Sequence, residues 1–188
     1  MDQEKLLIKQ ISDGNTHAFR LLIKQYEKLV VHIAGRMIHN KEDLEDLCQD
    51  VFMKVYEKLP GFRFDSKLST WIAAISYRTA INHLRKHKNQ TSELNDSSLF
   101  TDDALIIQEN PEDLMNKETL KKYIHKMIEK LSPVYRTVLT LYHLEEFNYK
   151  EIGEITGLPE GTVKNYLFRA RKLLKEKLKF ILKERELA

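Results

Sequence analysis

Residues 148–178, "NYKEIGEITGLPEGTVKNYLFRARKLLKEKL", decide the fold of the C-terminal half of the chain. Asn148 and Glu151 have capping-box spacing, in which each side chain can bond the backbone N–H of the other, so a helix is predicted directly after Asn148. Gly157 suits the left-handed residue that ends a helix, and Pro159 suits the first turn of the next helix. The pattern therefore predicts a short helix, a tight turn and a second helix.

The second helix of this pair is predicted to have two unlike faces. Four apolar residues share the face that would pack on the first helix: Val163, Leu167, Ala170 and Leu174. The opposite face is basic, and Glu176 is the only acid from residue 164 to residue 179. Like charges at this density repel one another in an isolated helix, whereas DNA phosphates neutralise them. An α-helix also fits the DNA major groove, so we expect this face to bind DNA.

Eight residues of this helix are predicted to contact DNA: Thr162, Lys164, Asn165, Phe168, Arg169, Arg171, Lys172 and Lys175. Lys164 and Arg171 can bond guanine or phosphate, and Asn165 can read a base edge. Phe168 can pack on a thymine methyl group or a sugar. The alternative is an ordinary solvated basic face, with Phe168 covering a neighbouring helix. Agreement among turn chemistry, charge and apolar face favours DNA binding.

The composition is that of a mostly helical globular protein. The 188 residues are 42% hydrophobic and include only six Gly and four Pro, which predicts packed cores and few strands. Cys48 is the only cysteine, which excludes an internal disulfide and a Cys-x-x-Cys zinc site and suits a reducing compartment. The sequence contains neither a membrane-span pattern nor a signal-peptide pattern. We therefore expect a cytoplasmic protein without direct membrane insertion.

The charge of the chain is unevenly distributed. The formal net charge is +3, but residues 89–116 hold seven acids and no Lys or Arg, so the remainder carries 31 basic and 21 acidic residues. This excess of basic over acidic residues outside the segment points to a polyanionic partner. Ser, Thr, Asn and Asp cluster in the acidic segment, which is predicted to be a flexible linker between two small helical domains. The predicted fold is all-α, with domains at 1–88 and 117–188.

The N-terminal domain is predicted to be a helical bundle. Apolar residues at three-and-four spacing predict a helix within 15–39 and another within 41–59. A third helix is predicted over about 69–86, capped by the hydroxyl of Ser69 or Thr70. A short helix near the N-terminus completes the bundle.

One stripe of the third helix mixes an aromatic ring, an amide and cations. Trp71, Arg78, Asn82 and Arg85 recur at intervals of seven, four and three residues and are flanked by Lys86. Such a stripe suits unpaired DNA, because bases stack on aromatic rings and cations follow the backbone. The alternative roles are core packing for the Trp and surface solubility for the Arg residues.

The helix within 41–59 is acidic at its start, with five acids and no base from residue 42 to residue 50. Early acids interact favourably with the helix dipole, which accounts for part of this pattern. A DNA-binding protein has little use for an acidic ridge facing its ligand, so we expect the ridge not to face DNA, and a plain solvated face is one interpretation of it.

The histidines and carboxylates do not form a recognisable reactive site. His83 and His87 have the spacing of half a metal site, but their basic neighbours disfavour a cation. A phosphate-binding glycine loop and a catalytic constellation are also missing from the sequence. We expect no bound metal, no cofactor and no enzymatic activity.

Three segments together resemble the extracytoplasmic-function (ECF) group of bacterial RNA polymerase sigma factors. Residues 148–178 resemble region 4, while "DLEDLCQDVFMKVYEKLPGF" (43–62) and "STWIAAISYRTAINHLRK" (69–86) resemble region 2. The resemblance implies that region 2 binds core RNA polymerase and melts the minus-ten element. It implies that region 4 reads the minus-thirty-five element and rests on the polymerase β flap. It further implies that the acidic linker follows the channel later used by RNA, and that an anti-sigma factor is a common kind of partner.

The resemblance also assigns roles to residues of the first domain. The loop at 61–69 is implied to hold a base flipped out of the duplex, with Phe62, Arg63, Phe64 and Lys67 as its candidate contacts. The acidic helix is implied to dock on the clamp helices of the polymerase β′ subunit through Glu42, Asp43, Asp46, Gln49 and Asp50. The competing interpretation is a stand-alone helix-turn-helix regulator, which would bind a palindromic duplex site alone as a symmetric dimer.

Overall fold

The computed structural model describes residues 2–89 and 124–186, so the predicted linker lies outside the described residues except for its first residue. All regular elements in the described part are helical, which confirms the all-α class. They are α1 (Asp2–Ser12), α2 (Thr16–Ala34), α3 (Lys41–Lys58), the 3₁₀ turn η1 (Leu59–Gly61), α4 (Leu68–Asn89), α6 (Pro133–His143), α7 (Tyr149–Thr156) and α8 (Glu160–Glu186). A further helical segment covers 124–129.

Helices α1 to α4 form the predicted N-terminal bundle, in which α2 contacts α1, α3 and α4. Asparagine side chains start two of these helices. Asn15 accepts hydrogen bonds from the N–H groups two and three residues later, and Asn40 does the same at the start of α3. The predicted helix within 15–39 ends at Ala34, and the turn after it buries Met37 and Ile38.

The predicted hydroxyl cap of α4 is wrong. The helix begins at Leu68, before both candidate residues, and the Leu68 side chain is almost fully buried. The Thr70 hydroxyl is also buried and has no hydrogen-bond partner, so it does not cap the helix. Burial of an apolar side chain therefore determines where the first turn forms.

The C-terminal half contains the predicted helix, turn and helix. The Glu151 N–H donates to Asn148 Oδ1 at 3.0 Å, and the Asn148 N–H donates to Glu151 Oε2 at 2.9 Å, which confirms the capping box. Gly157 has φ +76°, a conformation that glycine adopts without steric strain, and it ends α7. The predicted apolar face of α8 is buried through Ala170, and α6 and α7 both contact α8.

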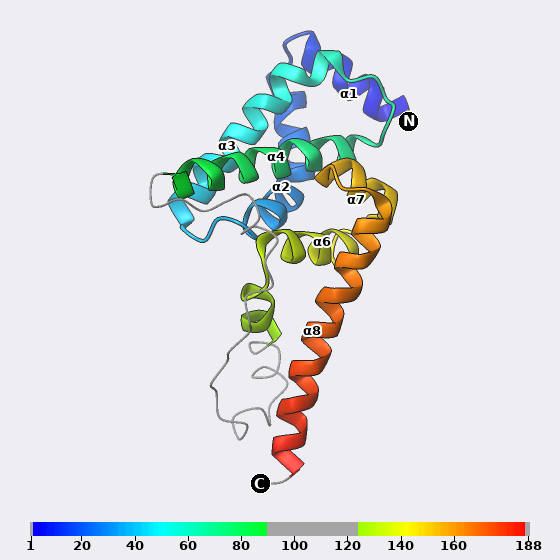
Figure 1. The fold of residues 1–188 in the computed structure, drawn as a ribbon. Helices are drawn as coiled ribbons and strands as arrows, with labels where there is room; N and C mark the ends of the chain where they lie inside the picture. Colours follow the sequence, from blue (N-terminus) through cyan, green and yellow to red (C-terminus); the bar gives the residue numbers. More distant parts are fainter. Residues whose placement is uncertain (1, 90–123, 187–188) are drawn as a thin grey trace.

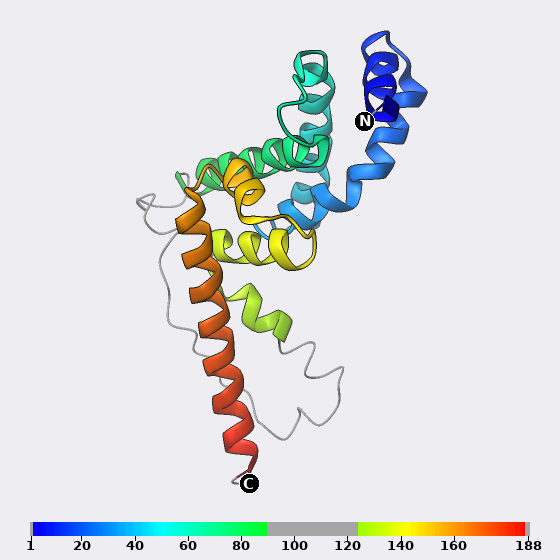
Figure 2. The same cartoon turned by 90° about the vertical axis from the view of Figure 1, so that its right-hand side faces the viewer.

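The two halves of the molecule pack against each other. Helix α7 lies against α4, and α6 lies against α2, in both views of the ribbon (Figures 1 and 2). Buried apolar side chains from both halves form one continuous cluster. The C-terminal part of α8 extends away from this body (Figures 1 and 2).

Candidate functional site

The basic face of α8 is open to solvent. Phe168 is 66% exposed, although it is a large apolar side chain, and its neighbours Asn165 and Arg169 are also exposed. Of the other predicted DNA contacts, Lys164, Arg171, Lys172 and Lys175 are exposed and Thr162 is half-buried. The structure therefore brings all eight predicted residues to one helix and leaves an apolar ring at the centre of its outer face.

Some of the α8 cations already have partners within the chain. Lys164 bonds Glu160 at 2.7 Å, and Lys172 lies 3.8 Å from Glu176, both at i,i+4 spacing. In the described part of the chain, Arg169 and Lys175 form no ion pair. Exposed pairs of this kind contribute little to stability, so phosphates can replace the carboxylates.

Two stacked tyrosines hold α8 against α6 and α7, an arrangement that we call the tyrosine clamp (Tyr142, His143 and Tyr149). The Tyr142 and Tyr149 rings stack with centroids 5.2 Å apart and an interplanar angle of 11°. The Arg171 guanidinium lies 4.9 Å from the centroid of Tyr142, and Lys164 Nζ lies 5.3 Å from that of Tyr149. Arg171 Nε also donates to His143 Nε2 at 3.2 Å.

The clamp changes the acidity of its members. Partial burial, together with the Arg171 charge, holds the pKa of His143 below its usual value of 6.5, which favours the neutral imidazole that accepts the Arg171 bond. Hydrogen bonds with Tyr149 and Arg171 lower the pKa of Tyr142, while the bond with Tyr142 raises the pKa of Tyr149. Sequence periodicity does not find the clamp, because its members lie on different helices.

The predicted stripe on α4 is divided between two environments. Trp71 is half-buried and its ring centroid lies 5.2 Å from that of Phe62, so this ring belongs partly to the core. Arg78, Asn82 and Arg85 are exposed and line a cleft of about 350 Å³.

The opposite wall of that cleft comes from the C-terminal half of the chain. It consists of Val134, Thr156 and Leu158. Lys86, at the end of the stripe, is exposed and faces a different cleft, between α3 and α4. The contact between the two halves was not predicted from the sequence, because no local pattern encodes it.

The loop before α4 contains two phenylalanines in contrasting positions. Phe62 is 9% exposed and its ring centroid lies 4.8 Å from that of Phe64. Phe64 is 40% exposed and has φ +60°, a left-handed conformation that is unusual for a bulky residue. Arg63 is exposed. Phe64 is thus the phenylalanine of this loop that can meet a ligand.

Lys67, the last predicted contact in this loop, is bound to the other half of the chain. Its Nζ lies 2.8 Å from Glu151 Oε1. Burial alone would raise the pKa of Glu151, but hydrogen bonds from Lys67 and from the Asn148 N–H lower it overall. The bond with Glu151 in turn raises the pKa of Lys67.

The predicted acidic surface of α3 has two sides. Asp43, Asp46 and Asp50 line the polar cleft that also contains Asn82 and Lys86. Glu42, which is exposed, stands at the start of the helix.

Gln49 lies on the other side of α3, along a wide apolar groove of about 750 Å³ between α2 and α3. The groove is lined mainly by Phe19, Ile23, Val31, Leu44, Cys48, Phe52 and Met53. Met53 is 57% exposed and Val31 is 43% exposed. The sequence did not predict the groove, because apolar periodicity predicts helix faces and not the space that remains between two helices.

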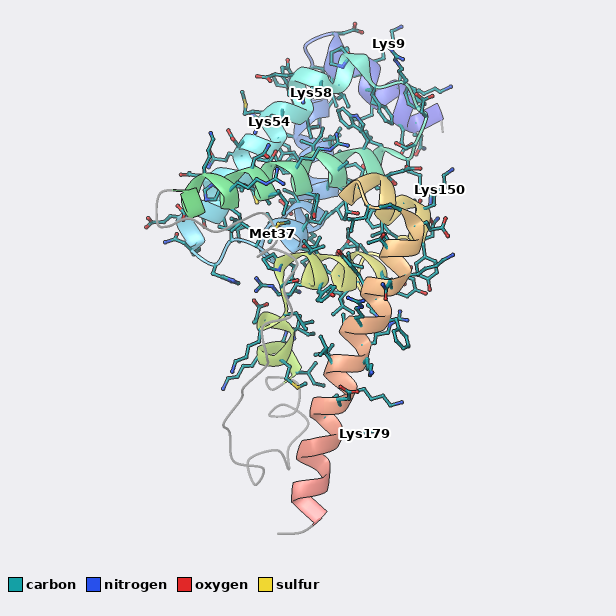
Figure 3. All side chains as sticks on the ribbon, viewed as in Figure 1. Lys9, Met37, Lys54, Lys58, Lys150 and Lys179 are labelled. Carbon is teal, nitrogen blue, oxygen red and sulfur yellow. The ribbon has the colours of Figure 1, made fainter. Side chains whose placement is uncertain are left out.

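Cationic side chains occur on both halves of the molecule. Lys54 and Lys58 lie on α3, Lys150 lies at the start of α7, and Lys179 lies far along α8 (Figure 3). Among the residues that the structure describes, no three His, Cys, Asp or Glu side chains are grouped as metal ligands would be. None of the described helices is both long and apolar enough to cross a bilayer.

Comparison with known families matches both halves of the chain. Sigma-70 region 2 matches residues 22–90, and sigma-70 region 4 matches residues 121–174. The chain is 32% identical to the RNA polymerase sigma-H factor of Pseudomonas aeruginosa, over 97% of each protein. It is also 32% identical to the ECF RNA polymerase sigma-E factor of Escherichia coli, over 93% of this chain and 94% of that protein.

Solved structures share the fold. A structure of CnrH in complex with the cytosolic domain of CnrY matches with a TM-score of 0.64 and 19% identity, over 93% of this chain and 96% of that one. The sigma factor RpoE of Bartonella quintana, crystallised with the anti-sigma factor NepR, matches with a TM-score of 0.64 and 24% identity, over 86% and 96%. Both family regions match, and the matches to relatives cover nearly the whole length of the chain. The protein therefore belongs to the ECF group of RNA polymerase sigma factors.

Proposed function

We propose that this sigma factor divides promoter recognition between two faces, with region 4 reading the upstream element through α8 and region 2 capturing the opened strand through α4. The proposed domains are 1–88 for region 2 and 117–188 for region 4, with 89–116 as the linker. The observation that carries the proposal is the presence of two separate cationic, aromatic-bearing faces in a chain that belongs to this family.

The exposed face of α8 has the chemistry that duplex reading requires. Arg169 and Lys175 are available for phosphates, and Asn165 can bond a base edge. The exposed Phe168 ring can pack on a thymine methyl group. Arg171 is a positioning residue in this proposal, because its contacts with Tyr142 and His143 hold α8 in place while its charge remains near the DNA.

The α4 face and the preceding loop suit single-stranded DNA. Arg78 and Arg85 can follow the backbone, and Asn82 lies between them for contact with a base. Phe64 offers an exposed ring for a flipped base. The buried Phe62 ring contacts the rings of both Phe64 and Trp71 and so holds the loop against α4.

Core polymerase is the proposed occupant of the apolar groove between α2 and α3. An exposed apolar surface of this size is typical of protein-binding sites, and Gln49 and Glu45 give it a polar rim. In this proposal the β′ clamp helices lie along the groove beside Glu45, while Asp43, Asp46 and Asp50 stand on the opposite side of α3 and face the cleft with α4. Region 4 is proposed to rest on the β flap.

The protein is proposed to act in the cytoplasm, without chemistry of its own, and to supply only binding energy to the polymerase. An anti-sigma factor is the proposed regulatory partner. The structure of RpoE with the anti-sigma factor NepR supports this part of the proposal, because that sigma factor shares the fold.

Run-off transcription with purified core polymerase on a promoter library tests the proposal. We expect start sites only when the sigma factor is present, downstream of an asymmetric pair of elements. Asn82→Ala should leave duplex docking intact and slow strand opening, whereas Arg171→Ala should weaken use of the upstream element. Binding of the isolated chain to a palindromic duplex, without any transcription by the polymerase, would instead indicate a stand-alone regulator.

A matched pair of variants tests the groove. Met53→Glu places a charge in the groove and is expected to weaken core-polymerase binding by about tenfold, the effect of losing a central interface contact. Leu6→Glu makes the same change at a similarly exposed residue on α1, which does not line the groove, and should bind normally. Equal binding by both variants would exclude the groove as the docking surface.

A further inference from the structure

The N-terminal helix α1 contributes a cation to the surface around the loop before α4. Lys5 Nζ lies 5.5 Å from the centroid of the Phe64 ring and covers one of its faces. The contact follows from the fold, because α1 also contacts η1, the turn that leads into this loop. From the sequence, α1 was expected only to complete the bundle. Lys5 is thus a neighbour of the proposed base-binding ring that local patterns did not reveal.

The packing of α1 determines the position of Lys5. Ile8 and Ile11 are buried, and α1 contacts α2. Glu4 accepts a hydrogen bond from Tyr26 of α2, and burial together with Glu4 raises the pKa of Tyr26 to about 12. Lys5 follows Glu4 directly and lies three residues before Ile8, so it stands at the edge of the buried face of α1. The Lys5 side chain therefore lies beside the loop because its helix is fixed on α2 and η1.

The ring of Phe64 needs support because its backbone conformation is unfavourable. Its φ of +60° is in the left-handed region, where the Cβ atom crowds the following carbonyl oxygen. Residues in this region keep their conformation only where the surrounding structure holds them, and they cluster at ligand sites. The Phe64 ring is held by the Phe62 ring, with centroids 4.8 Å apart, and by the Lys5 ammonium group. Loss of the Lys5 contact should therefore leave the ring less well placed for a ligand.

Within the described part of the chain, no carboxylate draws the Lys5 ammonium group away from the ring. Lys5 is exposed and forms no ion pair within residues 2–89 and 124–186. Lys67, the lysine of the loop itself, is bound to Glu151 at 2.8 Å. A cation over an aromatic ring is attracted by the negative charge of the ring face. Lys5, rather than Lys67, is thus the lysine that can hold the Phe64 ring.

We propose that α1 belongs to the base-binding site and that Lys5 is a positioning residue for Phe64. The Lys5 ammonium group covers one face of the ring and holds the ring in place, so that a base flipped out of the promoter duplex stacks on the uncovered face. The ligand of this site is one unpaired nucleotide of the opened strand. The inference rests on the proposed role of Phe64 in base capture, and it adds a residue from a helix outside the loop.

Variants at position 5 test this assignment in the polymerase holoenzyme, on a promoter found by run-off transcription. Lys5→Met keeps an unbranched side chain of similar length but removes the charge, whereas Lys5→Arg keeps a cation over the ring. Lys9→Met removes an exposed charge from the next turn of α1 and is the matched control. Both lysines are exposed, so all three variants should unfold at the same urea concentration as the wild type.

Binding is measured with single-stranded minus-ten oligonucleotides in which each base in turn is replaced by an abasic site. The captured base is the one whose removal abolishes the difference between wild type and Phe64→Leu. With this base present, Lys5→Met should bind about threefold more weakly than wild type, as expected for one exposed cation–π contact, while Lys5→Arg and Lys9→Met should bind normally. With the base removed, or in a Phe64→Leu background, Lys5→Met should cause no further loss.

Equal weakening by Lys5→Met and Lys9→Met would overturn the inference, because charge near the DNA would then explain the loss without contact with Phe64. Unchanged affinity in Lys5→Met would also overturn it, and so would the same threefold loss in the Phe64→Leu background. Failure of the proposed function gives a different result. In that case Phe64→Leu binds every oligonucleotide like the wild type and no abasic position responds, so the inference falls together with base capture by Phe64.

Discussion

The guanidinium of Arg171 lies 4.9 Å from the centroid of the Tyr142 ring, and its Nε donates to His143 Nε2 at 3.2 Å. The contact joins the middle of α8 to the C-terminal end of α6. Arg171 therefore differs from Arg169, which has no ion pair within the described part of the chain. Two arginines on one helix are thus predicted to have separable roles, one in positioning the helix and one in binding phosphate.

Substitution of the two arginines should separate these roles. Arg169→Ala should reduce the slope of log affinity against log salt by about 1, because one phosphate contact is lost. Arg171→Lys keeps the charge but loses the planar group that stacks on Tyr142, so we expect about a threefold loss of duplex affinity. Fluorescence anisotropy on an upstream-element duplex over a salt series measures both. Wild-type affinity in Arg171→Lys would show that only charge matters at this position.

The tyrosine clamp should also be sensitive to pH through His143. Partial burial and the Arg171 charge lower the pKa of His143 in the folded protein below 6.5, so the unfolded chain binds more protons between the two values. Stability from this group is complete above about pH 6.5 and is lost as pH falls through the folded pKa. An NMR titration should place the His143 midpoint below 6.5 in the wild type and higher in Arg171→Ala. An unchanged midpoint in that variant would exclude the contact.

The local features of the fold were predictable from sequence because each depends on neighbouring residues. The capping box at Asn148 and Glu151 and the left-handed Gly157 need only short-range chemistry, and all three have the predicted geometry. The start of α4 was not predictable from the same rules, because burial of Leu68 outweighed the capping preference of the next two residues. Tertiary packing thus decided this helix boundary.

The relations between helices were beyond a single-sequence analysis. Nothing in the sequence placed the rings of Tyr142 and Tyr149 in a stack beneath two cations. The packing of the two halves depends in the same way on contacts between distant residues, such as Lys67 with Glu151. The predicted α8 residues share one helix, whereas the predicted α4 stripe and the predicted α3 surface are each divided between two environments by packing between helices.

The two phenylalanines of the loop before α4 should have separable roles, Phe62 in stability and Phe64 in ligand contact. Phe62→Ala removes a buried ring and is expected to lower the free energy of unfolding by about 3 kcal/mol. Phe64→Gly removes an exposed ring from a left-handed residue, so stability should change little while promoter melting slows. Urea unfolding and permanganate footprinting of the open complex measure the two effects. Normal melting by Phe64→Gly would remove this ring from the proposed base pocket.

The buried Arg136 side chain offers a test of the interface between the two halves, because it bonds Glu129 at 2.6 Å and its Nη1 lies 3.2 Å from His39 Nε2 of the N-terminal half. Glu129→Gln leaves the guanidinium without its carboxylate partner, and burial already lowers the Arg136 pKa against the opposing effect of Glu129. We expect the free energy of unfolding to fall by about 2 kcal/mol, less than for a fully buried pair because Glu129 is 39% exposed. Urea unfolding at neutral pH measures this loss.

Glu129→Gln should have little effect on the free energy of unfolding in a variant that lacks the buried guanidinium. In an Arg136→Met background the side chain is apolar and of similar length, so Glu129→Gln should lower stability by less than about 0.5 kcal/mol. The double-mutant comparison therefore isolates the pair from general disturbance of the 124–129 segment. A full 2 kcal/mol loss in the Arg136→Met background would mean that Glu129 stabilises the fold through Arg36 or His39 instead, because these side chains also contact Glu129 across the interface.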